Sequence, residues 1–122
     1  MSFDLHAFPP SGPRTVAEVL QLLEAEEQRL LSGAGDALSP QEPEMARFLD
    51  ELEQRWPSLD EDPDASPWSD SPLWFPTMGG GATFGISWSR ADEMREAILE
   101  IAARTGVIIY DRQIPEVICP PR

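Results

Sequence analysis

The stretch of residues 84–110 most strongly limits the fold, because strand, helix, stop and strand signals follow one another without a break. Apolar residues alternate with small or polar ones over residues 82–88, which is the period of a strand with one apolar face. Residues 90–105 carry apolar side chains at helical spacing, with acidic residues on the opposite side. Gly106 is placed as a left-handed helix stop, and residues 107–110 are a β-branched and aromatic run. The pattern therefore predicts a strand, a helix and a second strand.

Three further strands and two further helices are predicted outside this stretch. Residues 2–8 alternate as a first strand, and apolar stripes predict helices over about 14–31 and 43–55. Residues 73–78 form a strand interrupted by a proline, so we expect this strand at a sheet edge. Residues 116–119 give a short optional last strand.

Helix starts are marked by paired polar residues at capping-box spacing. Thr15 and Glu18 precede the first helix, and Ser89 and Asp92 precede the third. The segment Ser39–Glu42 has the same kind of signal before the second helix, with a proline at the first helical position. The sequence therefore predicts side-chain caps at all three helices.

The element order is β-α-α-β-β-α-β, which predicts a single α+β domain over residues 1–122. We expect a mainly antiparallel sheet of four or five strands with the helices on one face, in the split β-α-β pattern of ferredoxin-like folds. The other face stays open around Thr83, Gly85 and Ser87. The predicted core consists of Leu5, Leu20, Leu23, Phe48, Leu52, Phe84, Ile86, Ile98, Ile101 and Ile109.

The chain carries a large net negative charge, which is unevenly distributed along the sequence. Asp and Glu number 22 against 9 arginines and no lysine, which gives a net charge of −13. Residues 1–72 carry −12 of this charge and residues 73–122 only −1. Such a chain is not expected to bind nucleic acid or an anionic membrane. It has no apolar run of membrane-spanning length, no signal-peptide pattern and one cysteine, so we expect a cytoplasmic protein.

The acidic segment of residues 42–70, with ten acids and two arginines, is the main candidate for a binding site. It contains most of residues 57–72, a loop rich in Pro, Ser and Asp. Loops of this length without regular structure are commonly functional or mobile. A solvated acidic loop is the simpler interpretation, but an acidic field next to tryptophans also suits a surface that attracts and holds a basic partner. The residues expected to contact that partner are Asp60, Glu61, Asp62, Asp64, Trp68 and Trp74.

A calcium loop is the alternative interpretation of the same acids. Asp60, Asp62 and Asp64 have the spacing of the first three ligands, but Ala65 stands where glycine is required and Ser71 where the closing glutamate belongs. No metal site and no cofactor are therefore expected.

Catalytic signatures are also missing from the sequence. Asp4 and His6 share one face of the first strand and are the one pair that suits acid–base chemistry. Cys119 has no base near it in sequence, and the glycines at 79–81 lack the ending of a phosphate-binding loop. We therefore expect a non-enzymatic protein, with a small enzyme using Asp4 and His6 as an alternative.

Several short motifs resemble those of a group of small, uncharacterised bacterial cytosolic proteins. They are Met1–Leu5, Arg55–Pro57 leading to Pro67–Trp68, Ser87–Ala91, Gly106–Val107 and Tyr110–Gln113. Some members of that group are suspected to be immunity-like proteins encoded near secreted toxins. The group's Asp-Pro-Gln turn is replaced here by Asp111-Arg112-Gln113, and the resemblance implies no catalytic residue.

The acidic composition, the acidic loop and the resemblance of the short motifs together predict an acidic binding protein of the immunity or antitoxin type. Such a protein inhibits a basic toxin such as a nuclease. The alternative from another class is a regulatory or ligand-binding domain. That domain would use the open sheet face at Thr83, Gly85 and Ser87, with the acidic loop serving solubility only.

Overall fold

The centre of the molecule is an antiparallel sheet in which the first strand of the chain lies in the middle. The computed structural model describes residues 2–31, 42–69, 74–77 and 80–119. Its strand order is β2-β3-β1-β4-β5, and every neighbouring pair is antiparallel. The strands are β1 (Ser2–Phe8), β2 (Phe75–Thr77), β3 (Gly81–Ser87), β4 (Ile108–Asp111) and β5 (Glu116–Ile118). Strands from both ends of the chain thus share one sheet in a single α+β domain.

Register fixes which side chains face each side of the sheet. Leu5 lies opposite Phe84 on β3 and opposite Asp111 on β4, whereas His6 lies opposite Thr83 and Tyr110. Because successive residues of a strand point to opposite faces, Leu5 and His6 belong to different faces. β2 and β5 are the sheet edges, as predicted for the proline-containing strand.

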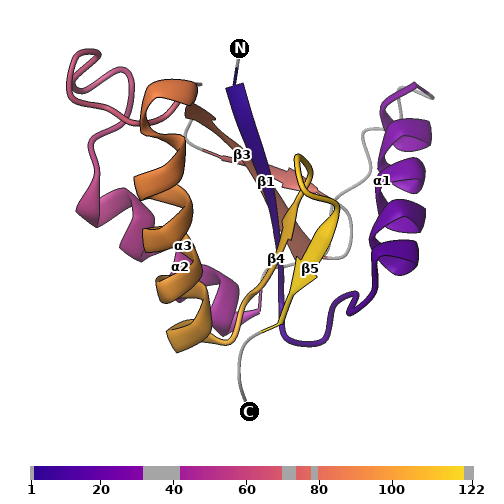
Figure 1. The fold of residues 1–122 in the computed structure, drawn as a ribbon. Coiled ribbons are helices and arrows are strands. Elements are labelled where there is room, and N and C mark those ends of the chain that lie inside the picture. The colour runs from indigo at the N-terminus through magenta and orange to yellow at the C-terminus, as the bar shows by residue number, and fades with distance from the viewer. Residues whose placement is uncertain (1, 32–41, 70–73, 78–79, 120–122) are drawn as a thin grey trace.

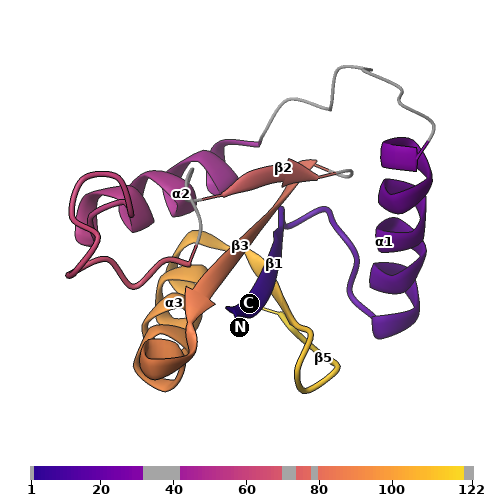
Figure 2. The ribbon, with the colours of Figure 1, turned by 90° about the horizontal axis from the view of Figure 1, so that it is seen from above.

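The helices lie on both faces of the sheet, not on one as predicted. α2 (Pro43–Arg55) and α3 (Ala91–Thr105) cover one face, and α1 (Val16–Leu31) lies across the other (Figures 1 and 2). The physical reason is that the second face is also apolar: Phe8, Ile108 and Tyr110 are buried there with Val19 of α1. A sheet that is apolar on both faces needs a layer on each.

Two clusters of buried side chains follow from this arrangement. The larger lies between the sheet and α2/α3 and contains eight of the ten predicted core residues: Leu5, Phe48, Leu52, Phe84, Ile86, Ile98, Ile101 and Ile109. The smaller lies under α1, and Leu23 packs against it while half-buried. Leu20 was wrongly predicted as core and is 51% exposed, because it follows buried Val19 and is turned about 100° away on the helix.

Helix ends agree with the sequence signals in part. Thr15 Oγ1 accepts a hydrogen bond from the Glu18 N–H at 3.2 Å and donates to its carboxylate, as predicted for α1. Gly106 ends α3 in the left-handed conformation at φ 84°. The predicted Ser89 cap is wrong, because residues 88–90 form a short 3-10 turn (η2) and Arg90 takes the N-cap position without a side-chain cap. α2 begins at Pro43, and residues 39–41 of its predicted cap lie outside the described residues.

Candidate protein-binding surface

The described part of the acidic loop, residues 57–69, is held by a contact between two tryptophans, Trp56 just before it and Trp68 near its end. Trp56 ends α2, and its N–H donates to the Leu52 carbonyl at 3.3 Å. Trp68 is fully buried, and its ring contacts those of Trp56 and Phe84 edge to face, each with centroids 6.0 Å apart. Residues 57–67 therefore lie between two tryptophans that contact each other, one of which also contacts β3.

Hydrogen bonds within the loop hold its backbone in turns. The Asp62 N–H donates to the Ser58 carbonyl at 3.1 Å, and the Ser66 N–H donates to the Asp62 carbonyl at 2.9 Å. Side chains add two bonds, from the Glu61 N–H to Ser58 Oγ and from the Ala65 N–H to Asp62 Oδ1, both at 3.1 Å. This part of the predicted irregular loop thus has a defined local structure.

The end of the loop joins the edge of the sheet next to η2 (Trp88–Arg90). Trp68 forms an isolated antiparallel bridge with Ile86 of β3, and the Ser87 N–H donates to the Pro67 carbonyl at 2.8 Å. The guanidinium of Arg90 donates to the Ala65 carbonyl at 3.1 Å. The loop is consequently anchored to the start of α3 as well as to the core.

Four acids in the described part of the loop project into solvent from this anchored backbone. Asp60, Glu61, Asp62 and Asp64 are all exposed, and residues 57–69 contain no basic residue. We call these four residues the acidic surface. The arginines that flank the loop are engaged with other acids: Arg55 lies 3.9 Å from Glu51, and Arg90 pairs with Glu93. The acidic surface therefore has a strongly negative field.

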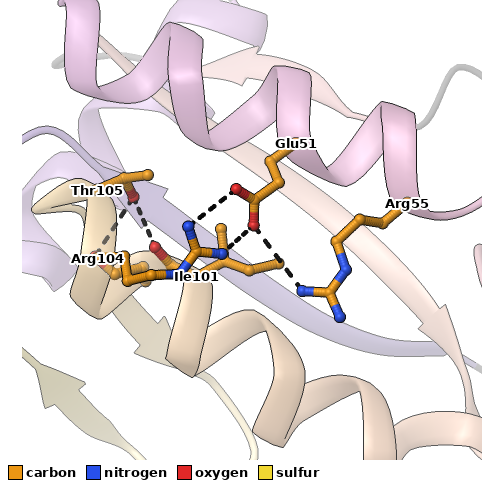
Figure 3. A network of polar contacts seen from close by, with 6 residues as sticks. Glu51, Arg55, Ile101, Arg104 and Thr105 are labelled. Carbon is orange, nitrogen blue, oxygen red and sulfur yellow. Dashed lines mark hydrogen bonds and ion pairs between the residues drawn. The ribbon is translucent and has the colours of Figure 1, made fainter.

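A polar network fixes α2, which leads into the loop, to α3. The Glu51 carboxylate receives two hydrogen bonds from the guanidinium of Arg104, one of them 3.1 Å long, and also faces Arg55 (Figure 3). This hydrogen bonding raises the pKa of Arg104 above its ordinary value. Thr105 Oγ1 donates back to the Ile101 carbonyl at 2.9 Å and tightens the end of α3. The base of the acidic loop thus rests on two connected helices.

The tryptophans predicted to contact a partner are not the accessible ones. Trp68 has no exposed surface, so the prediction that it anchors a partner is wrong. Trp74 is half-buried against the core and donates its indole N–H to Glu53 Oε1 at 3.2 Å. Trp88, in η2, is 46% exposed. The sequence did not indicate Trp88 as an accessible residue, because Trp88 continues the apolar alternation of β3. The helix-start residue Ser89 directly after it was the one sign that the strand ends before Trp88.

The alternative catalytic pair lies on the α1 side of the sheet, with Asp4 half-buried and His6 buried. His6 is 6% exposed, and neither ring nitrogen has a hydrogen-bond partner among the described residues. Burial lowers the pKa of His6 from 6.5 to about 4; Arg112 acts in the same direction and Asp4 opposes it. The imidazole is therefore neutral at pH 7 and shielded from solvent.

Asp111, the nearest further acid in the sheet, lies on the other face. Its fully buried carboxylate accepts a hydrogen bond from Arg95 Nε of α3 at 2.6 Å and another from the Gln113 N–H at 2.9 Å. The structure therefore does not bring Asp4, His6 and Asp111 into one cleft. Asp111 has a structural role, joining α3 to the β4–β5 turn.

The sheet face predicted to be open is partly covered. Gly85 is buried, Thr83 and Ser87 are half-buried, and the Thr83 hydroxyl donates to the Leu5 carbonyl at 3.4 Å. These residues lie on the α1 side, since Thr83 is opposite His6. They offer a ligand only a small polar surface, on which the Thr83 hydroxyl is already hydrogen-bonded within the sheet.

Neither a metal-binding cluster nor a membrane-spanning helix is present in the part of the chain that the structure describes. There, no three His, Cys, Asp or Glu side chains are grouped as metal ligands, and Ser71 of the calcium-loop pattern lies outside it. Across the same residues, no helix combines the length and apolar character that crossing a membrane requires. Cys119 is exposed and forms no disulfide.

Comparison of the chain with protein-family models, with curated proteins and with solved structures found no match. Inference about function must therefore start from the geometry of the acidic surface and its surroundings.

Proposed function

We propose that this chain is a non-enzymatic binding protein of the immunity or antitoxin type, which docks a basic protein such as a nuclease toxin and blocks its active surface. One observation carries the proposal: four exposed acids project from a loop segment that is held against the core by the contact between Trp56 and Trp68. A loop that served solubility alone would not need this anchoring.

Electrostatics and pre-organisation both favour such a role. A concentrated negative field raises the association rate of a basic partner by roughly 10–1,000-fold, and added salt screens the effect. A loop that is already ordered loses less conformational entropy on binding than a mobile one. The acidic surface is thus suited to rapid capture of a cationic surface.

Trp88 provides the apolar anchor that this docking model requires. It is exposed, and its neighbours in η2 and β3 bind the end of the loop through Arg90–Ala65 and Ser87–Pro67 hydrogen bonds. Exposed tryptophans are over-represented among residues that dominate binding energies. In the proposed complex, the acidic surface sets the association rate and Trp88 slows dissociation.

The remaining expectations belong to the same proposal. A cytoplasmic location suits an inhibitor that protects the cell producing it. The order β2-β3-β1-β4 and the α2/α3 layer support a ferredoxin-like classification, to which β5 and the separate α1 layer would be additions.

The test begins with a pull-down from the native host, followed by association kinetics of the recovered partner from low to high salt. Replacing Asp60→Asn, Glu61→Gln and Asp64→Asn together should slow association at low salt by about tenfold or more. Asp62 is kept because it supports the turn at Ala65. The matched control, Glu96→Gln with Glu100→Gln and Glu116→Gln, removes the same charge from exposed positions elsewhere. If both variants associate alike, or if salt has no effect, the docking role of the loop is wrong.

A further inference from the structure

A second surface, on the opposite side of the sheet from α2 and α3, has a different character from the acidic loop. An open groove of about 490 Å³ lies between α1 and the end of β4. Figure 1 shows α1 standing alone on this side of the molecule, beside the β4–β5 hairpin. The groove is lined by Leu20, Leu23, Glu24, Glu26, Glu27, Leu30, Tyr110 and Arg112.

Exposed leucines lie at both ends of the groove. Leu20 is 51% exposed, Leu30 is 64% exposed, and Leu31 next to it is exposed even further. Leu23 and Tyr110 form a floor that belongs to the smaller core cluster. The groove therefore presents exposed leucines at its two ends and apolar side chains along its floor.

The middle of the groove is acidic. Glu24 and Glu27 are exposed, and among the described residues neither forms an ion pair. Glu26 is already paired with Arg29 at 2.6 Å. Along the groove, α1 therefore has Leu20 and Leu30 at the ends, about 15 Å apart along the helix axis. Between them lie two glutamates that form no ion pair among the described residues.

From this pattern we propose that the α1 groove binds a basic amphipathic helix of another protein, with lysines or arginines between two apolar side chains. Charge complementarity selects this occupant. A second copy of the chain would place the glutamates of one α1 against those of the other, in either a parallel or an antiparallel arrangement. Like charges facing each other at an interface are unfavourable, so self-association is not the expected use of the groove.

Arg112 should oppose the binding of a basic helix in the groove. It lines the groove and carries the same charge as the proposed occupant. Removing its charge should therefore strengthen binding of a basic helix, whereas removing Glu24 and Glu27 should weaken it. A surface that bound only through apolar contact would respond to neither change.

The experiment uses the full chain and two synthetic helical peptides of about 18 residues. Both peptides carry leucines eleven positions apart; one has two lysines between them and the control has two glutamates. Binding is measured by calorimetry and by leucine methyl NMR. We expect the lysine peptide to bind, to shift the methyl signals of Leu20, Leu23 and Leu30, and to bind more weakly in high salt. The glutamate peptide should bind at least tenfold more weakly.

Variants of the chain complete the test. Two double variants should each lower the affinity for the lysine peptide about tenfold: Leu20→Ser with Leu30→Ser, and Glu24→Gln with Glu27→Gln. Arg112→Gln should raise that affinity a few-fold. The controls are Ile114→Ser, which removes an exposed apolar side chain outside the groove, and Glu96→Gln with Glu100→Gln on α3. Circular dichroism verifies that each variant is folded, as expected for exposed positions.

Four outcomes would overturn the proposal. They are equal binding of both peptides, equal effects of the control variants, a dimer of the free chain that dissociates in the leucine variant, and binding to anionic vesicles in place of the peptide. None of these outcomes depends on the acidic loop, so the test is independent of the function proposed above.

Discussion

The indole of Trp68 stands edge-on to that of Trp56, at an interplanar angle of 90° and a centroid distance of 6.0 Å. The contact joins residues 56 and 68, so that the four exposed acids lie on a segment closed at its base. Compact loops of this kind are commonly functional. The binding surface and the hydrophobic core thus share a structural element.

Shortening Trp68 should destabilise the whole domain. We expect Trp68→Ala to lower the free energy of unfolding by about 3–5 kcal/mol because it empties a fully buried ring position. Trp68→Phe should cost roughly half of that, since it keeps the aromatic contacts and removes an indole N–H that has no partner among the described residues. Urea unfolding measures both variants. Equal costs would show that ring packing is not the source of the stability.

Arg95 should matter more for stability than its partly exposed position suggests. Arg95→Met leaves the fully buried Asp111 carboxylate without its cation, which should cost about 3–5 kcal/mol. The double variant with Asp111→Asn should recover part of this loss, because the asparagine oxygen still accepts the turn hydrogen bond from Gln113. A double-mutant cycle by urea unfolding gives the coupling energy. Strict additivity of the two changes would contradict the role given to this pair.

His6 should make the fold sensitive to acid. Its pKa is about 4 in the folded chain and 6.5 when unfolded, so the unfolded state binds more protons between these values. The contribution of neutral His6 to the free energy of unfolding is fully present above pH 6.5. It is lost as the pH falls to about 4, which lowers the free energy of unfolding by about 3 kcal/mol. We expect His6→Phe to lack this part of the pH dependence.

The measurement for His6 compares urea unfolding of the two proteins at pH 7 and pH 4. Carboxylate effects are common to both, so the change in their difference isolates the histidine. Because His6 is the one histidine of the chain, its ring signals can also be titrated directly by NMR. Parallel stability profiles, or a ring that titrates near pH 6.5, would contradict the prediction.

Trp88→Ala should separate the two parts of the proposed docking surface. With the basic partner recovered from the host, we expect dissociation to accelerate about 10–30-fold, as for a typical interface anchor. The association rate should stay within about twofold, because no charge is changed. Surface plasmon resonance resolves both rates. Trp74→Ala is the comparison, and a larger effect of that variant would mean that the anchor has been placed wrongly.

Elements with strong local signals were predictable from sequence, and their packing was not. The strand, helix and glycine stop over residues 82–106 depend on contacts between close neighbours in the chain, and the structure has each of them nearly as predicted. The position of α1 depends on Ile108 and Tyr110 of β4, which lies far from α1 in the chain, as well as on Phe8. Its placement on the second sheet face therefore could not be inferred from its own periodicity.

The candidate site shows the same limit. Exposure of the four acids followed from their chemistry, because carboxylates are rarely buried without a partner. The tryptophans gave no such guide, since the ring suits a core and an interface equally well. Which of Trp68 and Trp88 is accessible depends on where β3 ends, and the bridge between Trp68 and Ile86 that settles it is a non-local contact.

The outermost strands of the sheet also bear on how the chain behaves at high concentration. β2 and β5 are each three residues long, and β2 contains Pro76, which has no backbone N–H to offer. An intruding strand from another molecule would find few hydrogen-bonding positions at either side, which is how natural sheets avoid edge-to-edge polymerisation. The longer strands β1 and β3 lie inside the strand order. The outer side of β3 is paired with β2 at residues 81–83 and with Trp68 at Ile86. A strand added along the outer side of β3 would therefore have to displace β2 or the Trp68 bridge.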